Sequence, residues 1–171
     1  MERYHLHTSI QQLQIGYYIT GHISKIQILY YVAAEIIGAI LGSLFVLTII
    51  GDKADLGANV PNFDFSMFLI FPVEVLASAM LMGVIFYVVY TKGLRGFSGV
   101  AIGGIVGLDI LFLAFISGAS MNPARALAPA LLSGVVENLW LYWTAPFVGT
   151  IIAAFAFRGK FKAQREREAK S

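Results

Sequence analysis

Four apolar stretches, each long enough to cross a lipid bilayer, dominate this sequence and decide what it can fold into. They run over about residues 26–50, 67–90, 97–116 and 139–157. A helix needs about 20 mostly apolar residues to span a bilayer. The composition agrees, because 58% of the 171 residues are apolar and 13% are charged, against about 25% charged residues in a soluble domain. The sequence therefore predicts an all-α integral membrane protein.

The polar start of the sequence argues against a signal peptide, and the absence of cysteine excludes two kinds of site. Residues 1–14 are polar and lack the apolar core of a signal peptide, so we expect the first long apolar stretch to direct insertion. The chain has no cysteine, which rules out disulfides and thiolate metal sites. No other cofactor is implied, and nothing in the sequence indicates nucleic-acid binding.

The distribution of basic residues predicts the orientation in the membrane. Lysine and arginine gather at Lys25, in the turn at 91–95 and in the tail at 158–170, whereas the connection at 51–66 holds three aspartates and one lysine. Loops rich in lysine and arginine remain in the cytoplasm. With four spans, all three basic segments fall on that side. We expect a protein of the cell membrane whose residues 159–171 form a basic cytoplasmic tail.

Glycines at four-residue spacing predict closely packed helices. They lie at Gly38 and Gly42 in the first stretch and at Gly99, Gly103 and Gly107 in the third. Small residues at this spacing let helix backbones approach each other in a membrane. The pattern is common in helical bundles, so it indicates packing and not function.

The segment at 117–133 is apolar but too short to cross the bilayer, which predicts a re-entrant piece. Asparagine is a good N-cap and proline suits the first helical position, so a short helix should begin at Asn122 and Pro123. The residues before it, 118–121, should be irregular. Irregular backbone at membrane depth occurs only inside protein or along a water-filled cavity.

Arg125 lies one turn into this short helix. A bare arginine at membrane depth costs about 2.5–3.5 kcal/mol on insertion scales, so its side chain should face water. The helix N-terminus adds about half a positive charge. Carbonyls at 118–121 would accept hydrogen bonds from a passing solute, Asn122 and Arg125 would donate them, and the positive charge would repel cations and protons. The candidate pore residues are Gly118, Ala119, Ser120, Met121, Asn122, Pro123, Ala124 and Arg125. A capped helix in an ordinary loop is the alternative.

Ser-Gly-Ala-Ser-Met-Asn-Pro-Ala-Arg at 117–125 resembles the second Asn-Pro-Ala motif of the aquaporins, the major intrinsic proteins. The sequence at 139–149 resembles the sixth span of that family, and residues 15–157 resemble its spans three to six. The resemblance implies an aquaporin-like bundle. Residues 26–158 would form the channel domain, with four transmembrane helices and one re-entrant half-helix where the family has six and two.

The resemblance also implies roles for particular residues. Glu74 is similar to a buried glutamate that braces the re-entrant loop in the family. Arg125, Ala119 and Ile110 match positions of its narrow selectivity filter. Water-selective members typically have histidine where this chain has Ile110, so we expect a wider and less polar constriction. Glycerol-selective members usually have aspartate where this chain has Ala126, which weakens a pure glycerol assignment.

The family pattern places its first Asn-Pro-Ala motif before Ile15, but residues 10–14 read Ile-Gln-Gln-Leu-Gln. Permitted codons for residues 5–14, shifted by two bases, can read Phe-Ala-His-Ile-Asn-Pro-Ala-Val-Ala. The hypothesis is a frameshift, with residues 1–25 as a remnant or frameshifted first-motif region, Met1 as an internal start and the family's first third absent. The alternative is a truncated protein with a remodelled N-terminus.

The leading functional prediction is a passive channel for water and small neutral solutes, including glycerol-like molecules or dissolved gases. It would be a homotetramer if full-length, and no enzyme. One alternative is a non-conducting fragment of such a channel. Another is an ion-coupled transporter, for which Glu35, Glu74 and Asp109 are available. A hydrolase built on Ser117 or Ser120 would need a nearby base, and all three histidines precede the first span.

Overall fold

The structure is a computed structural model that describes residues 11–20, 23–91 and 93–168, and all regular structure in those residues is helical. The four predicted spans are confirmed, each starting within a residue or so of its expected position. In chain order the helices are α1 (Gln11–Ile19), α2 (Lys25–Ile50), the 3-10 turn η1 (Lys53–Gly57), α3 (Met67–Tyr90), the 3-10 turn η2 (Arg95–Phe97), α4 (Ser98–Ser117), α5 (Pro123–Ser133) and α6 (Leu139–Glu168).

Local signals fix the ends of the first span. Ser24 is the N-cap of α2 and forms a capping box with Gln27, in which each side chain bonds the other residue's backbone N–H. The helix ends at Gly51, whose φ of 88° suits glycine. Between these caps the backbone stays helical even at Gly38 and Gly42, because no water is available at membrane depth to satisfy a broken backbone.

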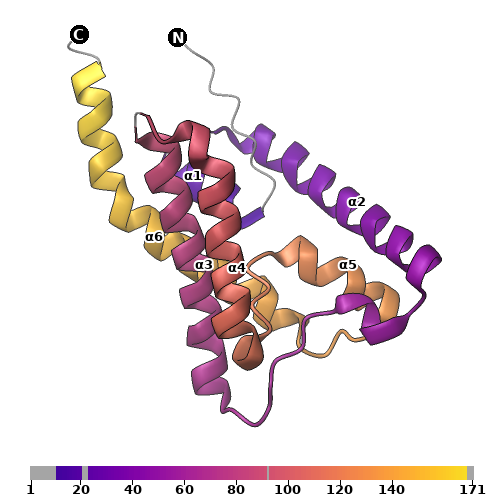
Figure 1. Cartoon of the computed structure of the whole chain (residues 1–171). Coiled ribbons are helices and arrows are strands. Elements are labelled where there is room, and N and C mark those ends of the chain that lie inside the picture. Colours follow the sequence, from indigo (N-terminus) through magenta and orange to yellow (C-terminus); the bar gives the residue numbers. More distant parts are fainter. Residues whose placement is uncertain (1–10, 21–22, 92, 169–171) are drawn as a thin grey trace.

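Three of the long helices form one group, and two short helices connect the fourth long helix, α2, to that group. α3 packs against α4 and α6, while α2 lies apart from this group and contacts mainly α1, α5 and η1. Both α1 and α5 also contact α6, so each short helix lies between α2 and α6 (Figure 1). The start of α2, the turn between α3 and α4 and the C-terminal end of α6 lie at the same end of the molecule in Figure 1.

The apolar surface is unevenly covered. Within the most apolar 18-residue window, 44% of residues are buried in α3 and in α6, against 6% in α4 and none in α2. The buried core is made by α1, α3, α6 and the segment before α5, with Tyr17 packing edge-on against Phe86 at a centroid distance of 5.7 Å. Most of α2 and α4 therefore presents apolar side chains outward, as helices in lipid or against other helices do.

Two elements differ from the sequence-based expectation. α1 was not predicted, because its nine residues begin with glutamines and are too short for periodicity to show; Gln14 and Tyr17 are nevertheless buried. α6 continues to Glu168, beyond the expected end of the last span. Alanine, lysine, arginine and glutamate there are good helix formers. Of residues 1–25, to which the frameshift hypothesis applies, 1–10 and 21–22 lie outside the described part of the chain.

The glycines at four-residue spacing in α2 and α4 do not make the close helix contacts that the sequence predicts. A Cβ added at Gly38, Gly42, Gly99, Gly103 or Gly107 meets no atom within 4 Å among the described residues. The close approach is instead at Gly149 of α6. A Cβ there would overlap the backbone oxygen of Val75 and lie 2.9 Å from the backbone nitrogen of Ala79, both in α3. Gly149 therefore permits the contact between the two best-buried spans.

We expect Gly149→Ala to destabilise the protein by about 1–3 kcal/mol, since the added methyl group forces α3 and α6 apart. Gly38→Ala is the matched control. It adds the same methyl group where nothing lies within 4 Å, and it improves helix propensity by up to about 1 kcal/mol. Thermal unfolding of both variants in the same detergent measures the difference, and equal unfolding midpoints would contradict the assigned contact.

Candidate pore site

The short helix α5 begins where the sequence predicts. Asn122 is its N-cap, with extended backbone (φ −155°, ψ 113°), and Pro123 is its first residue. The Asn122 Oδ1 accepts hydrogen bonds from the backbone N–H groups of Ala124 at 2.9 Å and Arg125 at 3.3 Å. The helix ends at Gly134 in the left-handed conformation. The capped first turn thus keeps the side-chain amide nitrogen of Asn122 and the positive end of the helix at the same place.

The four residues before Asn122 are irregular, as predicted, and their backbone is strained. φ is 87° at Gly118, 40° at Ala119 and 53° at Met121. Glycine adopts such values freely, but alanine and methionine do so at a cost of about 1–3 kcal/mol each, and only where the surroundings hold them. Several hydrogen bonds from other helices supply that support.

The Glu74 carboxyl group is the first support. Its Oε1 accepts a hydrogen bond from the Met121 backbone N–H at 2.7 Å, and its Oε2 accepts one from the Ser117 hydroxyl at 2.8 Å. Glu74 is fully buried. It follows Met67, the first residue of α3, by seven positions, which places it about 10 Å along that helix. One buried side chain of α3 therefore holds both ends of the strained segment.

Tyr142 of α6 is the second support. Its hydroxyl donates a hydrogen bond to the Ser117 carbonyl at 2.7 Å, and the ring is buried. A Cβ on Gly118 would lie 2.7 Å from this hydroxyl and 3.2 Å from the Val60 carbonyl oxygen. Only glycine therefore fits at position 118, for its backbone conformation and for the space around it.

Asn59, in the connection between η1 and α3, is a site residue that sequence analysis missed. Its Oδ1 accepts a hydrogen bond from the Arg125 guanidinium (Nη1) at 2.7 Å, and its Nδ2 donates one to the Gly118 carbonyl at 2.8 Å. The sequence around it, Gly-Ala-Asn-Val-Pro-Asn, has no periodicity, so no sequence signal separated Asn59 from an ordinary loop residue.

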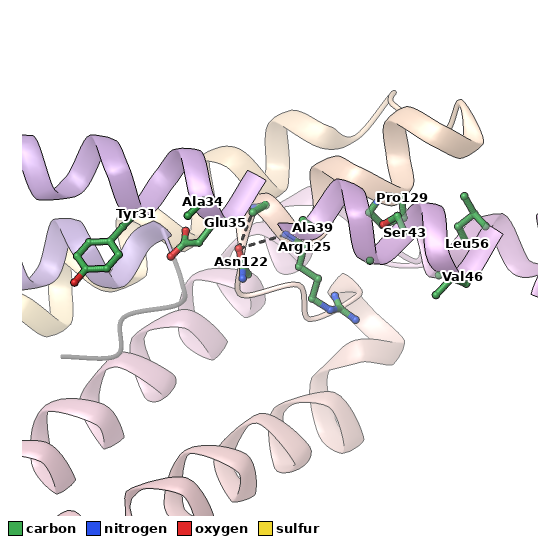
Figure 2. Close-up of a pocket in the computed structure, with 13 residues that line it drawn as sticks. Tyr31, Ala34, Glu35, Ala39, Ser43, Val46, Leu56, Asn122, Arg125 and Pro129 are labelled. Carbon is green, nitrogen blue, oxygen red and sulfur yellow. Dashed lines mark hydrogen bonds between the residues drawn. The ribbon is translucent and has the colours of Figure 1, made fainter. Parts of the chain in front are cut away.

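A pocket of about 660 Å³ lies between α2 and the start of α5. Its lining includes Asn122, Ala124 and Arg125 on one side and Glu35 and Ser43 of α2 on the other. Figure 2 shows these side chains, with the guanidinium of Arg125 extending away from the α2 ribbon. Arg125 is exposed. The expectation that its side chain faces water stays a prediction.

The structure does not bring all the predicted site residues into this pocket. Pro123, Ala119, Ser120 and Met121 are buried and contribute backbone groups and packing, and the Ser120 hydroxyl donates to the Asn122 carbonyl at 3.0 Å. Ile110 lies on α4, 45% exposed, and is not among the lining residues. Its membership of a filter with Arg125 and Ala119 stays a prediction.

Two further carboxyl groups lie on the spans. The Glu35 Oε1 accepts a hydrogen bond from Gln14 Nε2 at 2.6 Å, which connects α2 to α1. Asp109 on α4 is 1% exposed, and neither of its carboxyl oxygens has a hydrogen-bond partner in the described part of the chain. Among these same residues no cluster of three or more histidine, cysteine, aspartate or glutamate side chains could hold a metal ion.

Removing the Glu74 side chain tests its support of the loop. We expect Glu74→Ala to destabilise the protein by at least about 1–3 kcal/mol, because it leaves the buried Met121 N–H without a partner. Glu74→Gln keeps a carbonyl acceptor for that N–H, so its unfolding midpoint should lie between those of Glu74→Ala and the unsubstituted protein. Glu137→Gln, on an exposed residue, is the control. Unfolding midpoints that do not follow this order would refute the assigned role.

Comparison with known proteins places this geometry in one family. Residues 11–157 match the family model of the major intrinsic proteins. The chain is 33% identical to a probable aquaporin NIP7-1 of Arabidopsis thaliana over 90% of its own length and 55% of that protein. It is 34% identical to a probable aquaporin TIP1-2 of Oryza sativa subsp. japonica (90% and 62%), and 35% identical to nodulin-26 of Glycine max (84% and 53%).

A solved structure shows the same fold. The X-ray structure of the aquaglyceroporin from Plasmodium falciparum superposes with a TM-score of 0.74, covering 89% of this chain and 72% of that one at 21% identity. The four apolar spans, the capped half-helix α5 and the match over residues 11–157 agree with one another. This chain belongs to the major intrinsic protein family and has its helical membrane fold.

Proposed function

We propose that this protein forms a passive path for water and small neutral solutes across the membrane. The observation that carries the proposal is the start of α5, where Asn122 and Arg125 line a pocket between α2 and α5 in a chain with four apolar spans. Both side chains have N–H groups that can donate to a passing solute. A neutral solute that accepts and donates hydrogen bonds can exchange its water shell for these groups without forming a lasting complex.

Charge explains the proposed exclusion of ions. The α5 N-terminus presents about half a positive charge, and Arg125 adds a full one within the same turn. In a narrow, poorly solvated space both repel cations, including hydrated protons, more strongly than they would in water. Neutral solutes are not repelled by this positive charge. The site therefore selects neutral solutes because it excludes cations.

The solute class follows from the predicted filter. Ile110 and Ala119 supply no polar side chain, so Arg125 would be the main polar group of the constriction. We infer that the path admits glycerol-like molecules as well as water. The relatives are named aquaporins and the structural neighbour an aquaglyceroporin, which supports both solutes. We further propose a homotetramer in the cell membrane with the C-terminus in the cytoplasm.

The chain spans 53–62% of the length of the curated relatives described above. Conduction by the whole channel is therefore proposed for this chain, with a non-conducting fragment as the second candidate. The open apolar faces of α2 and α4 favour that candidate, because a complete path needs a wall on every side.

The remaining alternatives have less support. A coupled transporter would use the carboxyl groups of Glu35, Glu74 and Asp109, but Glu74 is fully buried and bonded to the loop. A serine hydrolase needs a free hydroxyl. That of Ser117 donates to Glu74, and that of Ser120 donates to the Asn122 carbonyl.

Proteoliposomes test the proposal. Vesicles that carry the protein should shrink faster in an osmotic jump than empty vesicles and take up glycerol faster, with no change when ion gradients are dissipated. Dependence on an ion gradient would identify a transporter instead. Rates equal to those of empty vesicles would support the non-conducting fragment.

Arg125→Met tests the charge barrier, because it keeps a long, unbranched side chain and removes its charge. We expect a severalfold rise in potassium leak through the same vesicles, measured with a potassium-sensitive dye. Arg158→Met is the matched control, since Arg158 is an exposed arginine in the C-terminal half of α6. An unchanged leak in the Arg125 variant would show that ions are excluded by another feature.

A further inference from the structure

The hydrogen bond between Gln14 of α1 and Glu35 of α2 uses only half of each side chain. Gln14 Nε2 donates to Glu35 Oε1 at 2.6 Å. The remaining oxygens, Gln14 Oε1 and Glu35 Oε2, are both buried, and neither has a hydrogen-bond partner in the described part of the chain. An amide oxygen accepts hydrogen bonds, and an ionised carboxylate can only accept them. Two bonded side chains therefore each present an acceptor that lacks a donor.

The elements that pack against α2 supply no donor to these two oxygens. Those elements are α1, α5 and η1. The other titratable residues on them and on α2 itself are Tyr17, Tyr18, Lys25, Tyr30, Tyr31, Lys53, Asp55 and Arg125. None of them bonds Glu35 Oε2 or Gln14 Oε1, and the Arg125 guanidinium bonds Asn59 instead. Among the described residues of these elements, no cation therefore pairs with the Glu35 carboxyl group.

Both side chains lie where water does not easily reach them. Glu35 follows the first residue of α2 by ten positions, about 15 Å along a helix that is about 39 Å long. Gln14 is 0% exposed. Its helix α1 packs closely at Gly16, where an added Cβ would overlap the end of the Met82 side chain and lie 3.1 Å from Thr150 Cγ2. Because a buried acceptor without a donor and an unpaired charge at membrane depth are both costly, the pair needs a hydrogen of its own.

We propose that Glu35 is a proton-binding site, whose carboxyl group carries a proton in the folded protein and donates it from Oε2 to Gln14 Oε1. A protonated carboxyl group has one O–H donor and keeps an acceptor oxygen. The acid and the amide then exchange two parallel hydrogen bonds, and neither oxygen is left without a partner. The proton comes from water and returns to water, so that only the O–H bond forms and breaks.

The proton on Glu35 also sets the charge of the pocket between α2 and α5. Among the described residues that line this pocket, Glu35 is the one acidic side chain and Arg125 the one basic side chain. With Glu35 neutral, Arg125 and the α5 N-terminus make the pocket positive. With Glu35 ionised, a carboxylate on the α2 side offsets that charge and weakens the repulsion of cations. This consequence rests on the proposed channel function, whereas the protonation does not.

Infrared spectroscopy of the full chain in lipid nanodiscs tests the protonation without any transport. A protonated carboxyl group has a C=O stretch at higher frequency than the amide bands, and an ionised carboxylate has none there. The spectrum of the unsubstituted protein minus that of Glu35→Gln should show one such band at neutral pH, and the band should disappear when the pH is raised. Glu35→Gln should fold, since two amides can exchange the same two hydrogen bonds. Absence of the band at neutral pH would overturn the proposal.

Glu137→Gln is the matched control, because it makes the same change on an exposed residue. Its difference spectrum at neutral pH should lack the protonated band. Gln14→Met tests the partner, since methionine has a side chain of similar length without the amide N–H donors and the amide oxygen. In that variant the Glu35 band should shift or vanish at neutral pH, and an unchanged band would overturn the pairing with Gln14.

Potassium leak tests the consequence for the pocket. In proteoliposomes that conduct water, raising the pH from neutral into the alkaline range should increase the leak of the unsubstituted protein severalfold, because Glu35 becomes ionised. The leak of Glu35→Gln should not change. A leak that rises equally in both proteins would overturn the role of Glu35 in ion exclusion. Absence of conduction by the unsubstituted protein would refute the channel proposal, and the infrared band would still decide the protonation.

Discussion

The rest of the site depends on the hydrogen bonds that the buried carboxyl group of Glu74 accepts. It accepts hydrogen bonds from Ser117 and Met121, the residues on either side of a backbone that would not keep its shape alone. Ala119 and Met121 are held at positive φ, at a cost of about 1–3 kcal/mol each. Without these bonds the segment would relax, and α5 would not begin with its positive end facing the pocket.

Support comes to the site from two sides. Glu74 of α3 and Tyr142 of α6 hold the backbone of the re-entrant segment from within the helix group. Asn59 reaches the Arg125 side chain from the connection before α3. The inner contacts fix where the helix begins, and the outer contact fixes where its charge lies. Backbone position and side-chain orientation thus have different physical origins.

Much of this arrangement could be predicted because the bilayer makes strong demands on a sequence. A span must be long, apolar and helical, so hydropathy located α2, α3 and α4 closely. Asn122 and Pro123 predicted the start of α5, because they are favoured residues at the N-cap and the first helical position. α1 escaped prediction because it is short and begins with glutamines. The contacts of Asn59 and Gly149 were not predicted, because both depend on which residues meet in space. No local sequence pattern encodes such long-range contacts.

The most direct test of the account is hydrogen exchange at the Met121 amide. The chain has five methionines, so selective ¹⁵N labelling gives few signals, and NMR in nanodiscs can follow each. If Glu74 holds the segment, the Met121 amide should exchange as slowly as that of Met82, buried within α3. Exchange as fast as that of Met67, in the first turn of α3 where amides lack helical partners, would contradict the account.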